Sequence, residues 1–103
     1  MNNVALSQKE LFIVKEVLNR YVPEFDVYVF GSRVNGTSSK VSDLDLAIIT
    51  KEPMNIEKII SLKSAFKESD LPFKVDIVDW ASTKENFRKI IESCRIKLQN
   101  QSK

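Results

Sequence analysis

The sequence predicts a small α/β domain, of the α+β kind, in which one β-sheet is covered by helices. Segments with helical periodicity alternate with short β-branched and aromatic segments along the 103 residues. A chain of this length encloses one hydrophobic core, and its 43% hydrophobic and 29% charged residues are ordinary for a folded domain. We therefore expect a single domain over residues 1–103, with a flexible polar tail at about residues 99–103.

The first half of the chain predicts one helix and two strands. Ser7-Gln8-Lys9-Glu10 has the pattern of a capping box, apolar residues follow at helical spacing, and Pro23 ends that helix. Residues 26–30 and 43–49 have the composition and the alternation of strands. The second strand has one face with Leu44, Leu46 and Ile48 and another with Asp43, Asp45, Ala47 and Ile49.

The second half predicts a helix, a strand and a last helix. Residues 55–67 have helical spacing, and residues 74–80 read as the third strand. The apolar stripe of that helix consists of Ile56, Ile59, Ile60 and Phe66. Ser82-Thr83-Lys84-Glu85 again resembles a capping box. The apolar face of the last helix consists of Phe87, Ile90, Ile91, Cys94 and Leu98, so Cys94 is interpreted as a packing residue rather than a reactive thiol.

The composition excludes several kinds of site and location. Without histidine, and with Cys94 as the single cysteine, the chain has no His-based triad, intrachain disulfide or Cys-based zinc site. Its net charge of +2 is too small to indicate direct nucleic-acid binding. No apolar run approaches the roughly 20 residues that span a bilayer, and the first residues lack the layout of a signal peptide. We therefore expect a cytoplasmic protein with no membrane contact.

Three aspartates in predicted strands are candidates for metal chemistry. Asp43 and Asp45 point to the same face of one strand, roughly 6–7 Å apart, and their repulsion favours a cation such as Mg²⁺. If the third strand is a neighbour, Asp76 completes a cluster of the kind that binds two metal ions for nucleotidyl transfer. The alternatives are that Asp43 is a turn residue and that Asp76 is exposed on an edge strand. Asp79 is interpreted as a strand-end residue.

A glycine-containing segment follows the first strand. The missing Cβ of Gly31 lets a triphosphate approach its backbone, and Ser32 can cap the next helical turn or bind a phosphate oxygen. Arg33 can bind phosphate or a nearby carboxylate. The alternative is an ordinary turn from strand to helix. Gly36 is predicted to end that helix in a left-handed conformation.

Read together, the segment from Gly31 to Ile48 contains Gly-Ser, ten residues and then Asp-x-Asp. This resembles the signature of the nucleotidyltransferase superfamily that includes DNA polymerase β, and within it the minimal nucleotidyltransferases. The resemblance implies the nucleotidyltransferase fold with a small mixed sheet. It implies that Gly31, Ser32 and Arg33 bind the nucleotide. The catalytic and metal-binding carboxylates would be Asp43, Asp45 and Asp76, with two Mg²⁺ ions. One position departs from the family pattern, because Asn35 replaces its second basic residue.

The resemblance also implies an activity and a partner. Members of this group transfer a nucleoside monophosphate, here AMP from ATP, to an acceptor hydroxyl. Minimal nucleotidyltransferases are typically encoded beside an α-helical HEPN protein, and many such pairs are toxin–antitoxin systems in which a tyrosine of the HEPN toxin receives AMP. The chain is therefore expected to be an adenylyltransferase antitoxin with a HEPN-type partner. The alternative is a non-catalytic antitoxin that binds nucleotide or acts sterically. Formation of a homodimer is left open.

Overall fold

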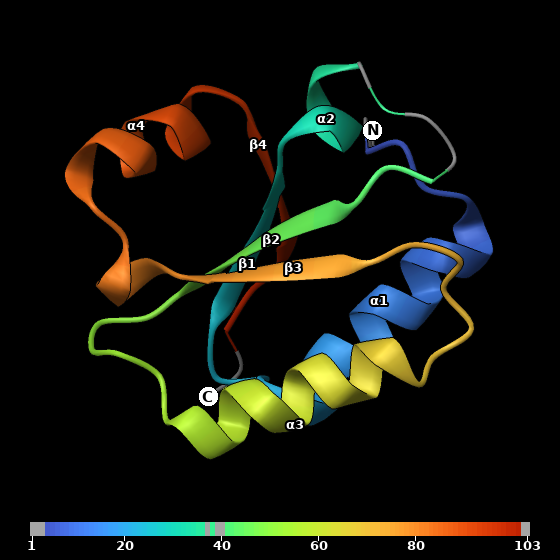
Figure 1. Cartoon of the computed structure of the whole chain (residues 1–103), viewed down its shortest axis with the longest axis horizontal. Helices are drawn as coiled ribbons and strands as arrows, with labels where there is room; N and C mark the ends of the chain where they lie inside the picture. The colour runs from blue at the N-terminus through green and yellow to red at the C-terminus, as the bar shows by residue number, and fades with distance from the viewer. Residues whose placement is uncertain (1–3, 37, 39–40, 102–103) are drawn as a thin grey trace.

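The computed structural model describes residues 4–36, 38 and 41–101, in which helices lie on both faces of a four-stranded sheet (Figure 1). The strand order is β3-β2-β1-β4. β1 (Asp26–Phe30) is antiparallel to both of its neighbours, β2 (Leu44–Ile49) and β4 (Arg95–Gln99). β3 (Val75–Asp79) is parallel to β2 and forms one edge of the sheet. The predicted α+β class with a mixed sheet is confirmed.

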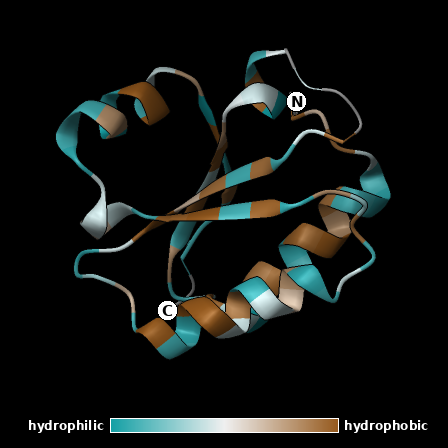
Figure 2. Cartoon of the chain, viewed as in Figure 1, coloured by the Kyte–Doolittle hydropathy of each residue, from teal (hydrophilic) through white to brown (hydrophobic). Residues whose placement is uncertain are grey.

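The larger core lies between the sheet and two helices, α1 (Gln8–Tyr21) and α3 (Ile56–Lys67). α1 begins with the predicted capping box, in which Ser7 and Glu10 each accept a hydrogen bond from the other's backbone N–H. Figure 2 shows hydrophobic and hydrophilic segments alternating along β2 and β3. The fully buried side chains of this core include Val14, Leu18, Leu44, Leu46, Ile48 and Leu62.

The opposite face of the sheet carries the short helix α2 (Ser32–Asn35) and α4 (Glu85–Ser93), which Figure 1 shows on the far side from α1 and α3. A smaller core of Phe30, Ala47 and Ile91 lies here. The alternation of β2 therefore divides the molecule as predicted, with Leu46 in the larger core and Ala47 in the smaller one.

The predicted last helix is wrong beyond Ser93, because β4 occupies Arg95–Gln99 beside β1. Polar and apolar residues alternate in this segment, and β1 provides the hydrogen-bonding edge that a strand requires. α4 also begins later than predicted: its N-cap is Lys84, whereas the Ser82 hydroxyl donates to the Asp79 carboxylate. Cys94 lies at the C-cap of α4 and is exposed, so its interpretation as a packing residue is wrong.

Two further predictions are corrected at the surface. Gln99 belongs to β4 rather than to a polar tail, and its Nε2 donates to the carbonyl oxygens of Val22 and Phe25 at 2.9 and 3.0 Å. Residues 102–103 of that predicted tail lie outside the described residues. In α3, Ile56 is 71% exposed and Ile60 is 58% exposed, so only part of the predicted apolar stripe faces the core. Among the described helices, none has the length and apolar character needed to cross a membrane.

Asp79 ends β3, as predicted, and connects it to the loop before α3. Its carboxylate accepts hydrogen bonds from the Thr50 hydroxyl, from the Met54 backbone N–H at 2.8 Å and from the Ser82 hydroxyl at 3.2 Å.

Replacing Asp79 with alanine removes this acceptor from a partly buried network, and we expect a loss of about 1–3 kcal/mol in the free energy of unfolding.

Urea unfolding measures this loss. The matched control is Asp70→Ala, which changes an exposed aspartate before β3. Equal stabilities of the two variants would contradict the anchoring role of Asp79.

Candidate functional site

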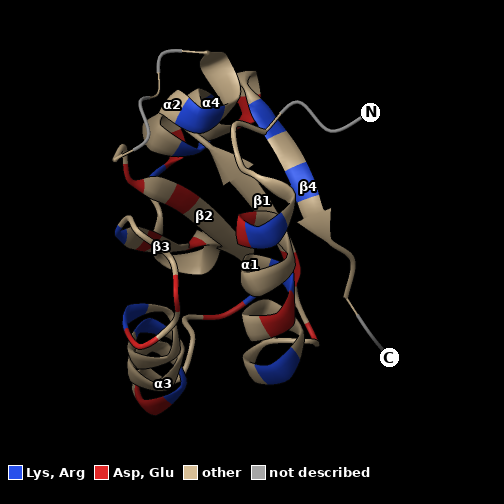
Figure 3. Ribbon diagram, turned by 90° about the vertical axis from the view of Figure 1, so that its right-hand side faces the viewer, with Lys and Arg blue, Asp and Glu red and all other residues tan. Residues whose placement is uncertain are grey.

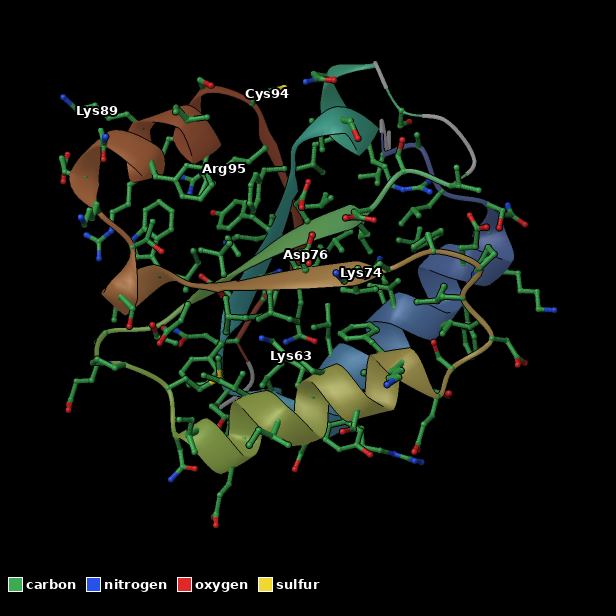
Figure 4. All side chains as sticks on the ribbon, in the orientation of Figure 1. Lys63, Lys74, Asp76, Lys89, Cys94 and Arg95 are labelled. Atoms are coloured by element: carbon green, nitrogen blue, oxygen red, sulfur yellow. The ribbon has the colours of Figure 1, made fainter. Side chains whose placement is uncertain are left out.

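Two of the three candidate carboxylates lie on neighbouring strands. The parallel register pairs Asp45 of β2 with Asp76 of β3, and adjacent strands are ~4.8 Å apart. Both residues alternate with side chains of the larger core, so they point to the face that carries α2 and α4. Figure 3 shows acidic segments side by side on β2 and β3, and Figure 4 labels Asp76. The sequence predicted a carboxylate cluster if the third strand is a neighbour of the second, and these two strands are indeed adjacent.

The charges of the two neighbouring aspartates act on Asp45. Partial burial raises the pKa of Asp45, and the charges of Asp76 and Asp43 raise this pKa further. Asp43 is exposed and directly precedes β2. No group of three His, Cys, Asp or Glu side chains is already gathered to hold a metal ion in residues 4–36, 38 and 41–101. The donors are all carboxylate oxygens, which suit Mg²⁺, and a divalent cation between them would offset their repulsion.

Gly31 lies directly against this cluster. It follows Phe30, which pairs with Asp45, and its backbone has φ 85° and ψ −156°, a region that only glycine visits readily. A Cβ at this position would collide with Oδ2 of Asp45 and lie 3.2 Å from its Cγ. Glycine is therefore required both by the backbone conformation and by the space that Asp45 occupies.

The short helix α2 begins after this glycine. Gly31 is its N-cap and no side chain caps it, so the prediction that Ser32 caps the helix is wrong. The carbonyl oxygen of Gly31 accepts hydrogen bonds from the N–H groups of Val34 and Asn35, at 3.0 and 3.1 Å. Gly36 ends α2 in the left-handed conformation, as predicted, with φ 87°. This geometry holds Ser32 one residue from the glycine that touches the carboxylate cluster.

Arg33 is buried, with 4% of its surface exposed. Its Nε and one terminal nitrogen donate to the carbonyl oxygen of Ser42 at 3.0 and 2.8 Å, and the other terminal nitrogen donates to that of Ala5 at 2.6 Å. Its Cζ lies 4.0 Å from the centroid of the Phe73 ring. This position differs from the expectation that Arg33 contacts the nucleotide.

These contacts connect the segments that carry the acidic residues. Ser42 directly precedes Asp43, and Phe73 lies three residues before Asp76. A backbone hydrogen bond from Leu44 to the carbonyl oxygen of Lys74, 2.9 Å long, joins the same two segments. Arg33 therefore positions the loop before β2 and the start of β3. The sequence reveals the basic residue but contains no sign of its partners, which come from distant parts of the chain.

Comparisons with known proteins agree with this architecture. The sequence pattern of the family described as polymerase beta, nucleotidyltransferase matches residues 13–103. A probable protein adenylyltransferase, MntA of Haemophilus influenzae, is 49% identical over 98 residues, which are 95% of this chain and 86% of the relative.

Solved structures share the fold. A toxin–antitoxin complex with AMP-PNP contains a chain with a TM-score of 0.74 and 22% identity, over 89% of this chain and 74% of that one. The complex of a tri-AMPylated Shewanella oneidensis HEPN toxin with an MNT antitoxin gives a TM-score of 0.70 and 20% identity, over 93% of this chain and 74% of that one.

The collision at Gly31 predicts a large effect of a single methyl group. Gly31→Ala must accommodate both a glycine-only backbone conformation and a clash with Asp45, and we expect the two costs together to lower the unfolding free energy by about 2–5 kcal/mol. The matched control is Gly36→Ala, whose added Cβ meets nothing within 4 Å. This variant should lose only about 1–2 kcal/mol of unfolding free energy, which is what a left-handed backbone conformation costs a residue other than glycine. Urea unfolding compares the two variants, and a Gly36→Ala loss as large as that of Gly31→Ala would refute the close approach.

The buried guanidinium predicts a second stability effect. Arg33→Met keeps an apolar stem against Phe73 but removes every hydrogen bond to Ser42 and Ala5, and we expect a loss of roughly 1.5–3 kcal/mol. Thermal or urea unfolding measures it, with Arg20→Met on the exposed surface of α1 as the control. If the two variants are equally stable, Arg33 does not hold these segments together.

Proposed function

Because the chain belongs to the polymerase beta nucleotidyltransferase family, it is a nucleotidyltransferase, and we propose that it transfers AMP from ATP to a protein hydroxyl. The observation that carries this proposal is the pairing of Asp45 with Asp76 beside Gly31. The name of the Haemophilus influenzae relative, a probable protein adenylyltransferase, supports AMP as the transferred group and protein as the acceptor.

We assign the triphosphate to Gly31 and Ser32. Without a Cβ at Gly31, a phosphate can approach the backbone beside the carboxylates. Ser32 contributes its hydroxyl from the first residue of α2. The buried Arg33 acts in this scheme through Ser42 and Phe73, by fixing the segments around the site.

We assign metal binding to Asp43, Asp45 and Asp76, with two Mg²⁺ ions as in the resemblance above. Bound there, the ions supply positive charge for the triphosphate and the departing pyrophosphate. Asp76, on the edge strand, accepts the proton of the acceptor hydroxyl. The acceptor oxygen bonds to the α-phosphorus in line, and the bond to pyrophosphate breaks. Most of the acceleration then comes from positioning and charge, which the fixed register of β2 and β3 provides.

The proposed acceptor is a tyrosine of a HEPN-type toxin, so that the chain acts as its antitoxin. This partner is supported by the similar fold of the MNT antitoxin that forms a complex with a tri-AMPylated HEPN toxin. The proposed nucleotide is supported by the similar chain in a complex with AMP-PNP. A cytoplasmic location and the lack of direct nucleic-acid binding stay predictions, and formation of a homodimer stays open.

The decisive variant is Asp43→Asn together with Asp45→Asn. Removing two charges from the cluster should leave the fold intact and reduce transfer by about a hundredfold or more, because the metal ligands are lost. The assay incubates the chain with Mg²⁺, ATP labelled on the α-phosphate and a HEPN-type protein as the candidate acceptor. Asp70→Asn is the control for a loss of surface charge elsewhere.

Transfer at nearly the wild-type rate by the double variant would refute the assigned roles. If the wild-type chain transfers no label but binds and neutralises the HEPN-type protein, the steric antitoxin replaces the enzyme as the function.

A further inference from the structure

A basic groove of about 500 Å³ lies between α3 and the edge strand β3. We call it the lysine groove. It has Lys63, Lys67 and Lys74 along it, Phe66 and Phe73 among its apolar residues, and Asp76 at one side. Figure 4 shows Lys63 in the space between α3 and β3, and Lys74, which directly precedes β3, near Asp76. The groove lies on the α3 side of β3, whereas the carboxylate of Asp76 points to the face that carries α2 and α4, so the groove is separated from the candidate site by the edge strand alone.

The position of the groove separates it from the proposed triphosphate site. In the sheet order, Gly31 follows β1, Asp45 is on the middle strand β2, and Asp76 is on the edge strand β3. A molecule that arrives over the open side of β3 meets Asp76 before it meets Asp45. A segment held in the groove therefore reaches the carboxylate of Asp76 by passing over this open edge of the sheet.

The charge of the groove is not balanced by the chain itself. Lys63 and Lys67 are one helical turn apart and so lie on the same side of α3. All three lysines are exposed, and no ion pair involves them in the part of the chain that the structure describes. Three like charges around a partly apolar cavity, with Asp76 as the acid among the residues that line it, favour an anionic partner with apolar side chains.

We infer that the lysine groove docks an acidic segment of the protein acceptor, which passes over the edge of β3 and so brings its hydroxyl to Asp76. This inference rests on the proposed function, and it identifies the surface that selects the protein acceptor. Acidic side chains of the segment pair with Lys63, Lys67 and Lys74, and an aromatic or aliphatic side chain occupies the cavity beside Phe66 and Phe73.

Binding is tested without any transfer reaction. The probe is a fluorescein-labelled peptide in which glutamate and phenylalanine alternate around one tyrosine, and its counterpart has lysine in place of glutamate. Fluorescence anisotropy should show the acidic peptide binding the chain at least about fivefold more tightly than the basic peptide. Equal affinities for the two peptides would overturn the inference.

The groove is tested with a charge-reversed pair. Lys63→Glu with Lys67→Glu should raise the Kd of the acidic peptide by about fivefold or more. The control is Lys9→Glu with Lys15→Glu, which makes the same change in net charge on exposed residues of α1 and should change the Kd by less than about twofold. Equal effects of the two pairs would assign binding to net charge and overturn the inference.

A third measurement distinguishes the acceptor from the nucleotide. The double variant Lys63→Glu with Lys67→Glu should bind a fluorescent ATP analogue with Mg²⁺ with an unchanged Kd. A selective weakening of this binding would mean that these lysines hold the nucleotide, which overturns the inference.

With the HEPN-type acceptor, the same double variant should raise the KM for the acceptor and leave kcat nearly unchanged. If the wild-type chain transfers nothing but peptide binding still depends on the groove lysines, the proposed function fails and the docking site stands.

Discussion

The guanidinium of Arg33 is the interaction on which the arrangement of the site depends. A buried cation is costly unless all sides of it are compensated, and here two carbonyl oxygens and an aromatic face surround it. A lysine has the charge but not the planar set of donors that reaches Ser42 through two nitrogens while the ring of Phe73 stacks below. Three segments that are separate in sequence therefore meet at one side chain. Two of these segments continue into Asp43 and Asp76, so the contacts of Arg33 also fix where these two aspartates lie.

The second constraint is the register between β2 and β3. In a strand, a shift by one residue moves every side chain to the opposite face, so Asp76 faces Asp45 only in one register. That register is fixed by the apolar neighbours, because Leu46 is fully buried and Ile77 packs against the same core. The hydrophobic core thus determines where the charges lie. A small domain without histidine can hold a polar, negatively charged cluster in this way, since the burial of its alternate residues supplies the stability that the repulsion of the carboxylates removes.

The sequence predicted those parts that depend on local periodicity and spacing. The alternation of β2 gave its two faces, and the Gly-Ser and Asp-x-Asp spacing located Gly31 and the carboxylates. The C-terminal strand was missed because Ile90, Ile91, Cys94 and Leu98 also fit helical spacing, and only the distant edge of β1 decides between the two structures. The inward orientation of Arg33 was missed for a similar reason, since Ala5, Ser42 and Phe73 approach it only in the folded chain. Local patterns predict which residues can react, whereas long-range contacts decide which of them face solvent.

The pairing of β4 with β1 has a consequence for the order in which the protein is made. β1 is a central strand, yet one of its two neighbours is assembled from residues 95–99. During synthesis on the ribosome, the segment that contains Gly31, Asp43 and Asp45 is made before β4. Until then β1 has an unprotected edge, which can pair with another nascent chain. The residues of the site are thus synthesised before the strand that completes the sheet beside β1.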